Sequence, residues 1–134
     1  MKREIVSDNE VATLWYYPDE GIVHHHFKKY AYGSHFRDTL EKGSEIFEQR
    51  GADKWLSDDR NNGALRAEDG EWGESVWVPR VMAAGWKAWA MVLPEKVIGK
   101  MNAKKYIELN ASRGITVEIF SDPDEALKWL ASFD

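Results

Sequence analysis

An α/β fold is predicted by the order of elements in the C-terminal third of the chain. An apolar strand over 86–93 is followed by a helix over 102–113, a second strand over 116–120 and a closing helix. This alternation of strands and helices is typical of α/β proteins. The near-continuous apolar run over 86–93 also suits a central strand that is covered on both faces.

An N-terminal β-hairpin is predicted by two segments rich in β-formers, 11–17 and 22–27, which flank Pro18-Asp19-Glu20-Gly21. Proline presets the turn and Gly21 supplies a positive φ. If Tyr17 faces Ile22, then Trp15 lies opposite His24. We expect this sheet face to be only partly covered, and we therefore assign Trp15, Tyr17 and His24 to an interface for homodimerisation, there or along an adjoining edge.

The middle of the chain predicts a helix, a short strand and an interrupted helix. Residues 34–50 show near-helical apolar spacing, with Ser34 as a possible N-cap, Gly43 as a weak point and Gly51 as the C-cap. Residues 54–57 predict a strand that leads into the polar loop 58–63. Over 66–84 the helical pattern is interrupted by glycines and Pro79, which predicts a kink or two short helices meeting near Val78.

The two remaining helices carry clear boundary signals. Gly114 suits the C-cap of the helix over 102–113. Ser121 or Asp122 is expected to cap the last helix, and Pro123 fits its first turn.

Composition limits the classes of function. The chain has 134 residues, which suits one domain, and 43% are hydrophobic, which argues against disorder. The formal charge of −5, with basic residues scattered along the chain, argues against nucleic acid as a partner. The longest apolar run, 88–93, is far shorter than the about 20 residues of a membrane span. With no cysteine in the chain, we expect a cytoplasmic protein without disulfides or cysteine-based zinc sites.

Short motifs over about 50–134 resemble the bacterial SpoIIAA-like family, a branch of the STAS superfamily that is also linked to the Sec14-like fold. The matching stretches are Lys54-Trp55-Leu56-Ser57-Asp58 with Arg60-Asn61, Trp72 ahead of Pro79, Gly85-Trp86-Lys87-Ala88-Trp89-Ala90, Asn110, Gly114-Ile115, and Asp124-Glu125-Ala126-Leu127-Lys128-Trp129-Leu130. The resemblance implies a single STAS-like domain over 1–134, with a mixed β-sheet flanked by helices, which acts without a cofactor as a regulatory or interaction module.

One departure from the family pattern concerns phosphorylation. In the anti-sigma-factor antagonists that the chain resembles, a phosphorylatable serine begins the helix after the strand that matches 54–57. Here the loop reads Asp58-Asp59-Arg60-Asn61-Asn62-Gly63 and carries no hydroxyl group. A phosphorylation switch at this position is therefore not expected, although the acidic residues could imitate a permanently charged state.

Three groups of residues are candidates for a site. The three histidines that begin at His24 are better explained as surface or interface residues than as metal ligands, because only His24 and His26 share a strand face. The acidic residues around 58–74 could form a divalent-cation or acid/base site, but a solvated acidic loop is the simpler reading. Seven tryptophans favour core packing, with an apolar pocket as the alternative.

The sequence therefore favours a non-enzymatic module that binds a protein partner, possibly a second copy of itself. The alternative is a binder or sensor of a small apolar, lipid-like ligand in a tryptophan-lined cleft, and a metal-assisted hydrolase is a remote third reading. No catalytic, metal-binding or cofactor residues are assigned. The residues expected to bind a partner or ligand are Asp58, Arg60, Asn61, Asn62, Trp72 and Trp77.

Overall fold

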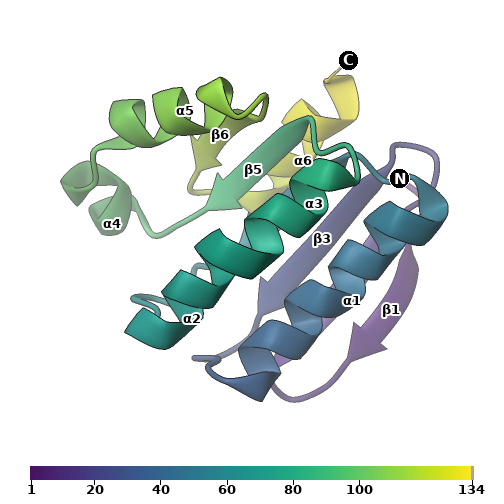
Figure 1. Ribbon diagram of the computed structural model, residues 1–134, viewed down its shortest axis with the longest axis horizontal. Helices are drawn as coiled ribbons and strands as arrows, with labels where there is room; N and C mark the ends of the chain where they lie inside the picture. The colour runs from purple at the N-terminus through teal and green to yellow at the C-terminus, as the bar shows by residue number, and fades with distance from the viewer. Residues whose placement is uncertain (134) are drawn as a thin grey trace.

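The computed structural model describes residues 1–133 and shows one six-stranded mixed sheet with helices on both faces (Figure 1). The strands lie side by side in chain order: β1 (Glu4–Asp8), β2 (Ala12–Tyr17), β3 (Ile22–Phe27), β4 (Lys54–Asp58), β5 (Ala88–Val92) and β6 (Thr116–Phe120). The first three pair antiparallel, and β3 to β6 pair parallel. The expected α/β class with a mixed sheet is confirmed.

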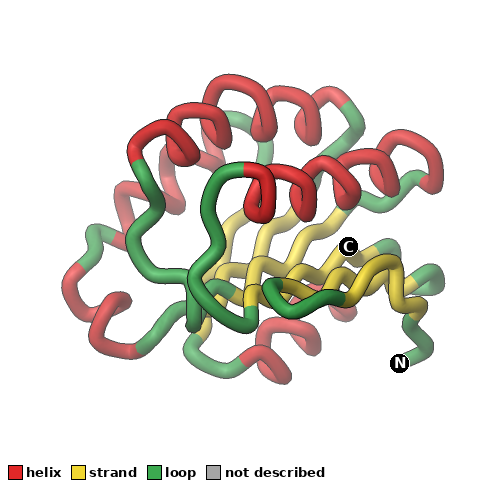
Figure 2. The backbone as a smooth tube through the Cα atoms, turned by 90° about the horizontal axis from the view of Figure 1, so that it is seen from below, coloured by secondary structure: helices red, strands yellow, loops and turns green. Residues whose placement is uncertain are grey.

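The helices are α1 (Ser34–Arg50), α2 (Ala67–Trp72), the π-helical turn η1 (Gly73–Trp77), α3 (Val78–Ala83), α4 (Glu95–Lys100), α5 (Ala103–Ser112) and α6 (Pro123–Ser132). Crossovers between sequential parallel strands share one hand, so α1, the α2–η1–α3 segment and α5 lie over the same sheet face. Helix α6 returns to the opposite face, and Figure 2 shows the sheet between these two unequal helical layers.

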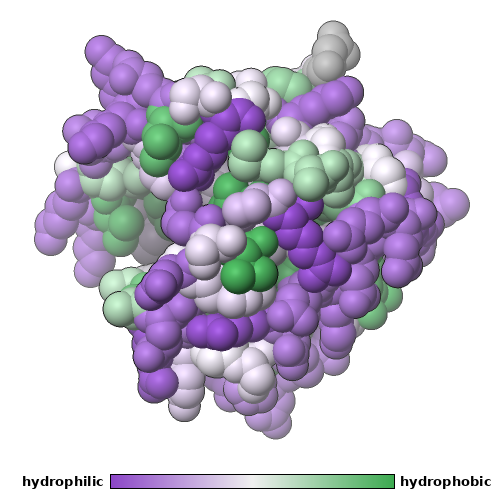
Figure 3. All heavy atoms as spheres, viewed as in Figure 1, coloured by the Kyte–Doolittle hydropathy of each residue, from purple (hydrophilic) through white to green (hydrophobic). Residues whose placement is uncertain are grey.

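Two apolar cores follow from this arrangement. Side chains from α1, η1, α3 and α5 meet the alternate residues of the strands on one face, where Trp55, Trp77, Trp86 and Trp89 contact one another. On the other face, Ala126 and Leu130 of α6 cover Leu56 and Ala90. The outward surface of the helices α1 and α3 is mostly hydrophilic, with small separate apolar areas between the polar side chains (Figure 3). Most of the tryptophans thus serve core packing, as expected.

The N-terminal hairpin has the predicted register. Tyr17 pairs with Ile22 and Trp15 pairs with His24, and Gly21 closes the turn with φ of 71°. Strand β1 was not predicted, because its apolar residues Ile5 and Val6 are adjacent and do not alternate; both are exposed in the structure. Helix α4 was also not predicted, since none of its six residues is buried.

Helix α1 has the predicted bounds, but its N-cap differs from the prediction. Gly33 occupies the cap position, and the Ser34 side chain makes no capping hydrogen bond. The backbone N–H of Gly33 instead donates to Oδ2 of Asp69, 3.0 Å away in α2. Gly51 ends the helix in the left-handed conformation, as expected.

The interrupted pattern over 66–84 produces a π-helical turn between two short α-helices. The backbone N–H of Val78 donates to the carbonyl of Gly73, five residues earlier, and α3 begins at Val78 with Pro79 in its first turn. Pro79 has no N–H to donate, so it fits the first turn of α3, where the spacing of the backbone hydrogen bonds changes from π-helical to α-helical. Two helices do meet at Val78, but they do so through η1 rather than through a break in the chain.

Candidate ligand-binding cavity

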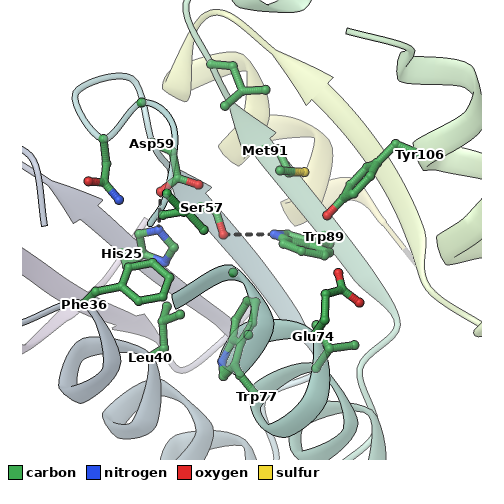
Figure 4. Close-up of a pocket in the computed structure, with 17 residues that line it drawn as sticks. His25, Phe36, Leu40, Ser57, Asp59, Glu74, Trp77, Trp89, Met91 and Tyr106 are labelled. Atoms are coloured by element: carbon green, nitrogen blue, oxygen red, sulfur yellow. Dashed lines mark hydrogen bonds and ion pairs between the residues drawn. The ribbon is translucent and has the colours of Figure 1, made fainter. Parts of the chain in front are cut away.

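A cavity of about 230 Å³ opens at the carboxyl ends of β3, β4 and β5, on the face covered by α1, η1 and α5 (Figure 4). Ligands of open α/β sheets bind at this end of the strands, because the loops that leave the strands converge there. The π-helical turn contributes three lining residues, Gly73, Glu74 and Trp77. Such turns occur frequently at functional sites.

The floor and walls of the cavity are apolar. Phe36 and Leu40 of α1 lie on one side, and Trp89 and Met91 of β5 lie on the other (Figure 4). Trp77 closes the bottom, where its ring meets that of Trp89 nearly perpendicularly at a centroid distance of 5.6 Å. A small ligand would therefore place most of its surface against carbon atoms.

His25 brings a polar group into this wall and has both ring nitrogens engaged. Its Nδ1 accepts a hydrogen bond from the indole Nε1–H of Trp55 at 2.9 Å. The ring hydrogen is therefore assigned to Nε2, which donates to Oδ1 of Asp59 at 2.8 Å. Asp59 is held in place by this bond, and its second carboxylate oxygen has no protein partner among the hydrogen bonds of residues 1–133.

Ser57 is the register partner of His25 on the neighbouring strand and also lines the cavity. Its hydroxyl oxygen accepts the indole Nε1–H of Trp89 at 2.9 Å. The hydroxyl hydrogen remains available as a donor. His25 cannot take that proton, since its Nδ1 already accepts from Trp55 and its Nε2 carries the ring hydrogen. Ser57, His25 and Asp59 therefore lie together without forming a nucleophile–base pair.

Two buried donors at the cavity lack partners. Asn62 is 3% exposed, and its carbonyl oxygen accepts from the backbone N–H of Ala31 at 2.7 Å. Its Nδ2 has no hydrogen-bond partner in the part of the chain that the structure describes. Trp77 is 5% exposed and its Nε1 is likewise unpaired. An unmet buried donor costs about 1–3 kcal/mol, so each of these groups would gain from a ligand acceptor within reach.

The far end of the cavity carries Tyr106 and Glu74 (Figure 4). Burial, with a further contribution from Glu74, raises the pKa of Tyr106 to about 12, so its hydroxyl stays protonated at neutral pH. Oε2 of Glu74 accepts from Nη2 of Arg113 at 2.9 Å. Arg113 does not line the cavity itself.

Of the six residues predicted to bind a partner or ligand, Asn62 and Trp77 line the cavity. Asn61 is exposed on the loop, and Trp72 packs against Phe36 and beneath Arg37, outside the lining. Asp58 and Arg60 lie at the opposite face of the sheet, because successive residues of β4 alternate in direction. The predicted set thus divides between the two sides of the domain.

Asp58 is the centre of a polar cluster on that opposite face. It accepts from Nε and Nη2 of Arg60 at 2.9 and 2.8 Å, and Nδ1 of His26 lies 2.8 Å from its Oδ2. Burial alone would raise the pKa of Asp58, but the hydrogen bonds from Arg60 and His26 hold that pKa below its ordinary value. Asp58 is 2% exposed, so its replacement by alanine would leave Arg60 and His26 without their shared acceptor.

The residues assigned to an interface are mostly covered within the chain. Tyr17 is 1% exposed and its hydroxyl lies 3.1 Å from Nδ1 of His24, which is 6% exposed. Burial is the main cause that lowers the pKa of His24 to about 3, so its ring stays neutral at pH 7. Trp15 is only half-buried, with the Arg3 guanidinium 4.4 Å from its ring centroid.

Within residues 1–133, no group of three or more potential ligands is arranged to hold a metal ion. Asp69, one of the acidic residues considered for such a site, is instead buried and accepts from Gly33 and from Nε of Arg37 at 3.1 Å.

In the same part of the chain, no helix combines the length and the apolar character that a bilayer crossing needs.

Sequence reasoning considered Asp59 and Glu74 only as members of an acidic loop, and it did not connect His25, Ser57 or Tyr106 with a cavity. A signal for His25 and Ser57 was available, because two neighbouring strands joined by a helix are usually parallel, and both residues lie near the carboxyl ends of their strands. The contributions of Glu74 and Tyr106 depend on how η1 and α5 are placed, which no local pattern encodes.

Comparisons with known proteins add no assignment: no family model, no curated protein and no solved structure matches this chain.

Proposed function

We propose that this protein binds a small, largely apolar ligand in the cavity and acts as a carrier or sensor without catalysing a reaction. The observation that supports this best is the cavity itself, which combines apolar walls with convergent polar groups at the carboxyl ends of parallel strands. Its volume of about 230 Å³ lies below the roughly 300–1,000 Å³ of pockets for drug-sized molecules, which favours a small ligand.

The hydrogen bonds of the polar groups support binding rather than catalysis. His25 is engaged at both ring nitrogens, so its imidazole is not free to activate the Ser57 hydroxyl. The groups left over are donors and acceptors suited to orienting a ligand: the Ser57 hydroxyl, Nδ2 of Asn62 and the outer oxygen of Asp59.

A substitution that fills the cavity tests this proposal. A Cβ atom added at Gly73 meets no atom within 4 Å, and Gly73 has helical φ and ψ, so Gly73→Leu should fold while occupying part of the cavity. Gly99→Leu is the matched control, because Gly99 also lies in a helix, has open space around its Cβ position and does not line the cavity.

Native mass spectrometry of protein purified from its own host gives the readout. We expect wild-type protein and Gly99→Leu to carry an additional small-molecule mass and Gly73→Leu to have lost it. The proposal fails if no ligand mass accompanies the wild-type chain, or if Gly73→Leu retains the ligand at the wild-type level.

A second proposal is the SpoIIAA-like interaction module, acting in the cytoplasm as a homodimer. It is supported by the ordered set of family-like motifs and by the exposed edge strand β1, where Ile5 is 67% and Val6 39% exposed. An edge strand with apolar side chains can pair with a second copy through its free backbone groups. Light scattering coupled to size exclusion tests this reading: we expect a dimer mass that Ile5→Lys converts to a monomer, and a monomeric wild-type chain would contradict it.

A further inference from the structure

We infer that the ligand of this cavity is a small organic cation, namely a protonated amine attached to an apolar body. This inference rests on the proposed ligand-binding function and specifies the chemical class of the ligand. The positive charge follows from the charge of the wall and from its aromatic rings, and an unpaired amide donor in the wall adds the requirement for a ligand oxygen.

The charge of the wall is negative. Among residues 1–133, Asp59 and Glu74 are the only formally charged residues that line the cavity, and none of its lining residues is a lysine or arginine. His25 adds no positive charge in the hydrogen-bonding arrangement described above. Arg113, which lies outside the lining, pairs with Glu74 and partly neutralises its negative charge. Asp59 is therefore the principal ionic group of the cavity wall. A carboxylate or phosphate ligand would face like charge here, whereas an ammonium group would be attracted.

The aromatic rings form a corner that suits a cation. Trp77 meets Trp89 at 80° with a centroid separation of 5.6 Å, and Trp89 meets Tyr106 at 61° and 6.0 Å (Figure 4). A cation within about 6 Å of a ring face is attracted by the negative face of its π system, and tryptophan is the strongest such partner.

Nδ2 of Asn62 is the independent sign of a ligand. The side chain is 97% buried, it lines the cavity, and its amide donor has no partner while its carbonyl oxygen is engaged. A hydroxyl or carbonyl oxygen on the ligand would satisfy this donor. An amine that also carries a neutral oxygen would therefore match both the carboxylate and the amide.

Three probes that share a phenyl ring and a hydroxyl group test the charge requirement by calorimetric titration at pH 7. They are 2-amino-1-phenylethanol, which is cationic, 1-phenylethanol, which is neutral, and mandelate, which is anionic. We expect the amine to bind at least tenfold more tightly than the neutral alcohol, since a charge-assisted hydrogen bond contributes about that much or more, and we expect mandelate to bind most weakly.

Charge-removing variants locate the effect. Asp59→Asn should lower affinity for the amine about tenfold and leave affinity for 1-phenylethanol nearly unchanged. Glu74→Gln should give a smaller loss and should fold normally, because Glu74 is half exposed and its side chain bonds only Arg113. Glu118→Gln is the control with the same charge change; Glu118 is exposed and pairs with Ala90, whose side chain belongs to the core on the α6 side.

The outcomes separate this inference from the proposed function. Equal affinity for the amine and the alcohol, or unchanged amine binding in Asp59→Asn, would overturn the cation requirement while leaving a ligand-binding function in place. Binding by none of the three probes at millimolar concentration would overturn the inference for amines of this size. The mass spectra of the wild-type and Gly73→Leu proteins would then judge the proposed function separately.

Discussion

Replacing Gly43 with alanine should destabilise the protein although alanine is the better helix former. Gly43 lies within α1, where the sequence marks it as a weak point. The structure explains why a glycine stands there: a Cβ atom would lie 2.3 Å from Cη2 and 2.8 Å from Cζ2 of Trp55. Since ordinary contacts begin near 3.4 Å, one of the two residues must move by about an ångström.

Trp55 has little freedom to give way. It is fully buried, its Nε1–H donates to His25, and its ring contacts Phe47, Trp77 and Trp86 at centroid distances of 5.6, 5.0 and 6.2 Å. Overpacking of a tight core costs about 1–3 kcal/mol, and the upper end suits a clash with a fixed indole. The helix propensity of alanine returns about 1 kcal/mol. We therefore expect a net loss of about 2 kcal/mol in the free energy of unfolding.

Urea denaturation followed by circular dichroism measures this loss, with Gly99→Ala as the matched control. At Gly99 a Cβ atom meets nothing within 4 Å, so the same substitution there should be neutral or stabilising by up to about 1 kcal/mol. A Gly43→Ala protein as stable as the wild type would refute the reasoning, because it would mean that the α1–sheet interface can yield at no cost.

Three further predictions concern buried polar groups and use the same denaturation assay. The pKa of His24 is lowered from 6.5 to about 3, so the unfolded chain binds a proton below pH 6.5 that the native chain does not. As the pH is lowered from 6.5 to about 3, we therefore expect the free energy of unfolding to fall by up to about 1.4 kcal/mol per pH unit. The His24→Gln protein should lack this pH dependence, and equal slopes in the two proteins would contradict the lowered pKa of His24. Asp58→Asn should cost about 2 kcal/mol, because it removes the charge that pairs Arg60 and His26; a loss below about 0.5 kcal/mol would mean that solvent screens the cluster. Asp69→Ala should also cost about 2 kcal/mol by leaving the Gly33 N–H and Arg37 without their acceptor, and unchanged stability would show that water replaces it.

Local signals predicted most of the fold. The hairpin register followed from one turn and a period of two, and the bounds of α1 and β6 followed from apolar spacing and flanking residues. These signals did not predict toward which face of the sheet a given side chain points. Asp58 and Asp59 are adjacent and chemically alike, yet one pairs with Arg60 on the α6 side while the other meets His25 at the cavity. Only the pleat of β4, fixed by its pairing with two neighbours, separates their surroundings.

Asn62 and Trp72 illustrate the same limit. Both are polar or aromatic residues near the expected cleft, but Asn62 enters the cavity wall because its carbonyl accepts from Ala31, a contact across 31 residues of sequence. Trp72 precedes the π-helical turn, and its ring lies against Phe36 instead of the cavity. A change in helical hydrogen-bond spacing alters which residues share a face, and no local pattern predicts its position.

The loop that follows β4 is fastened on both sides of the sheet, by Asp58 to Arg60 and His26 on one side and by Asp59 to His25 on the other. Its start therefore has little conformational freedom to lose when a molecule docks beside it. A ligand would then bind to a preorganised site, because the conformational entropy of this part of the loop is already lost when the protein folds. A docking event of this kind should proceed at a rate set by access to the opening and not by a slow rearrangement of the chain.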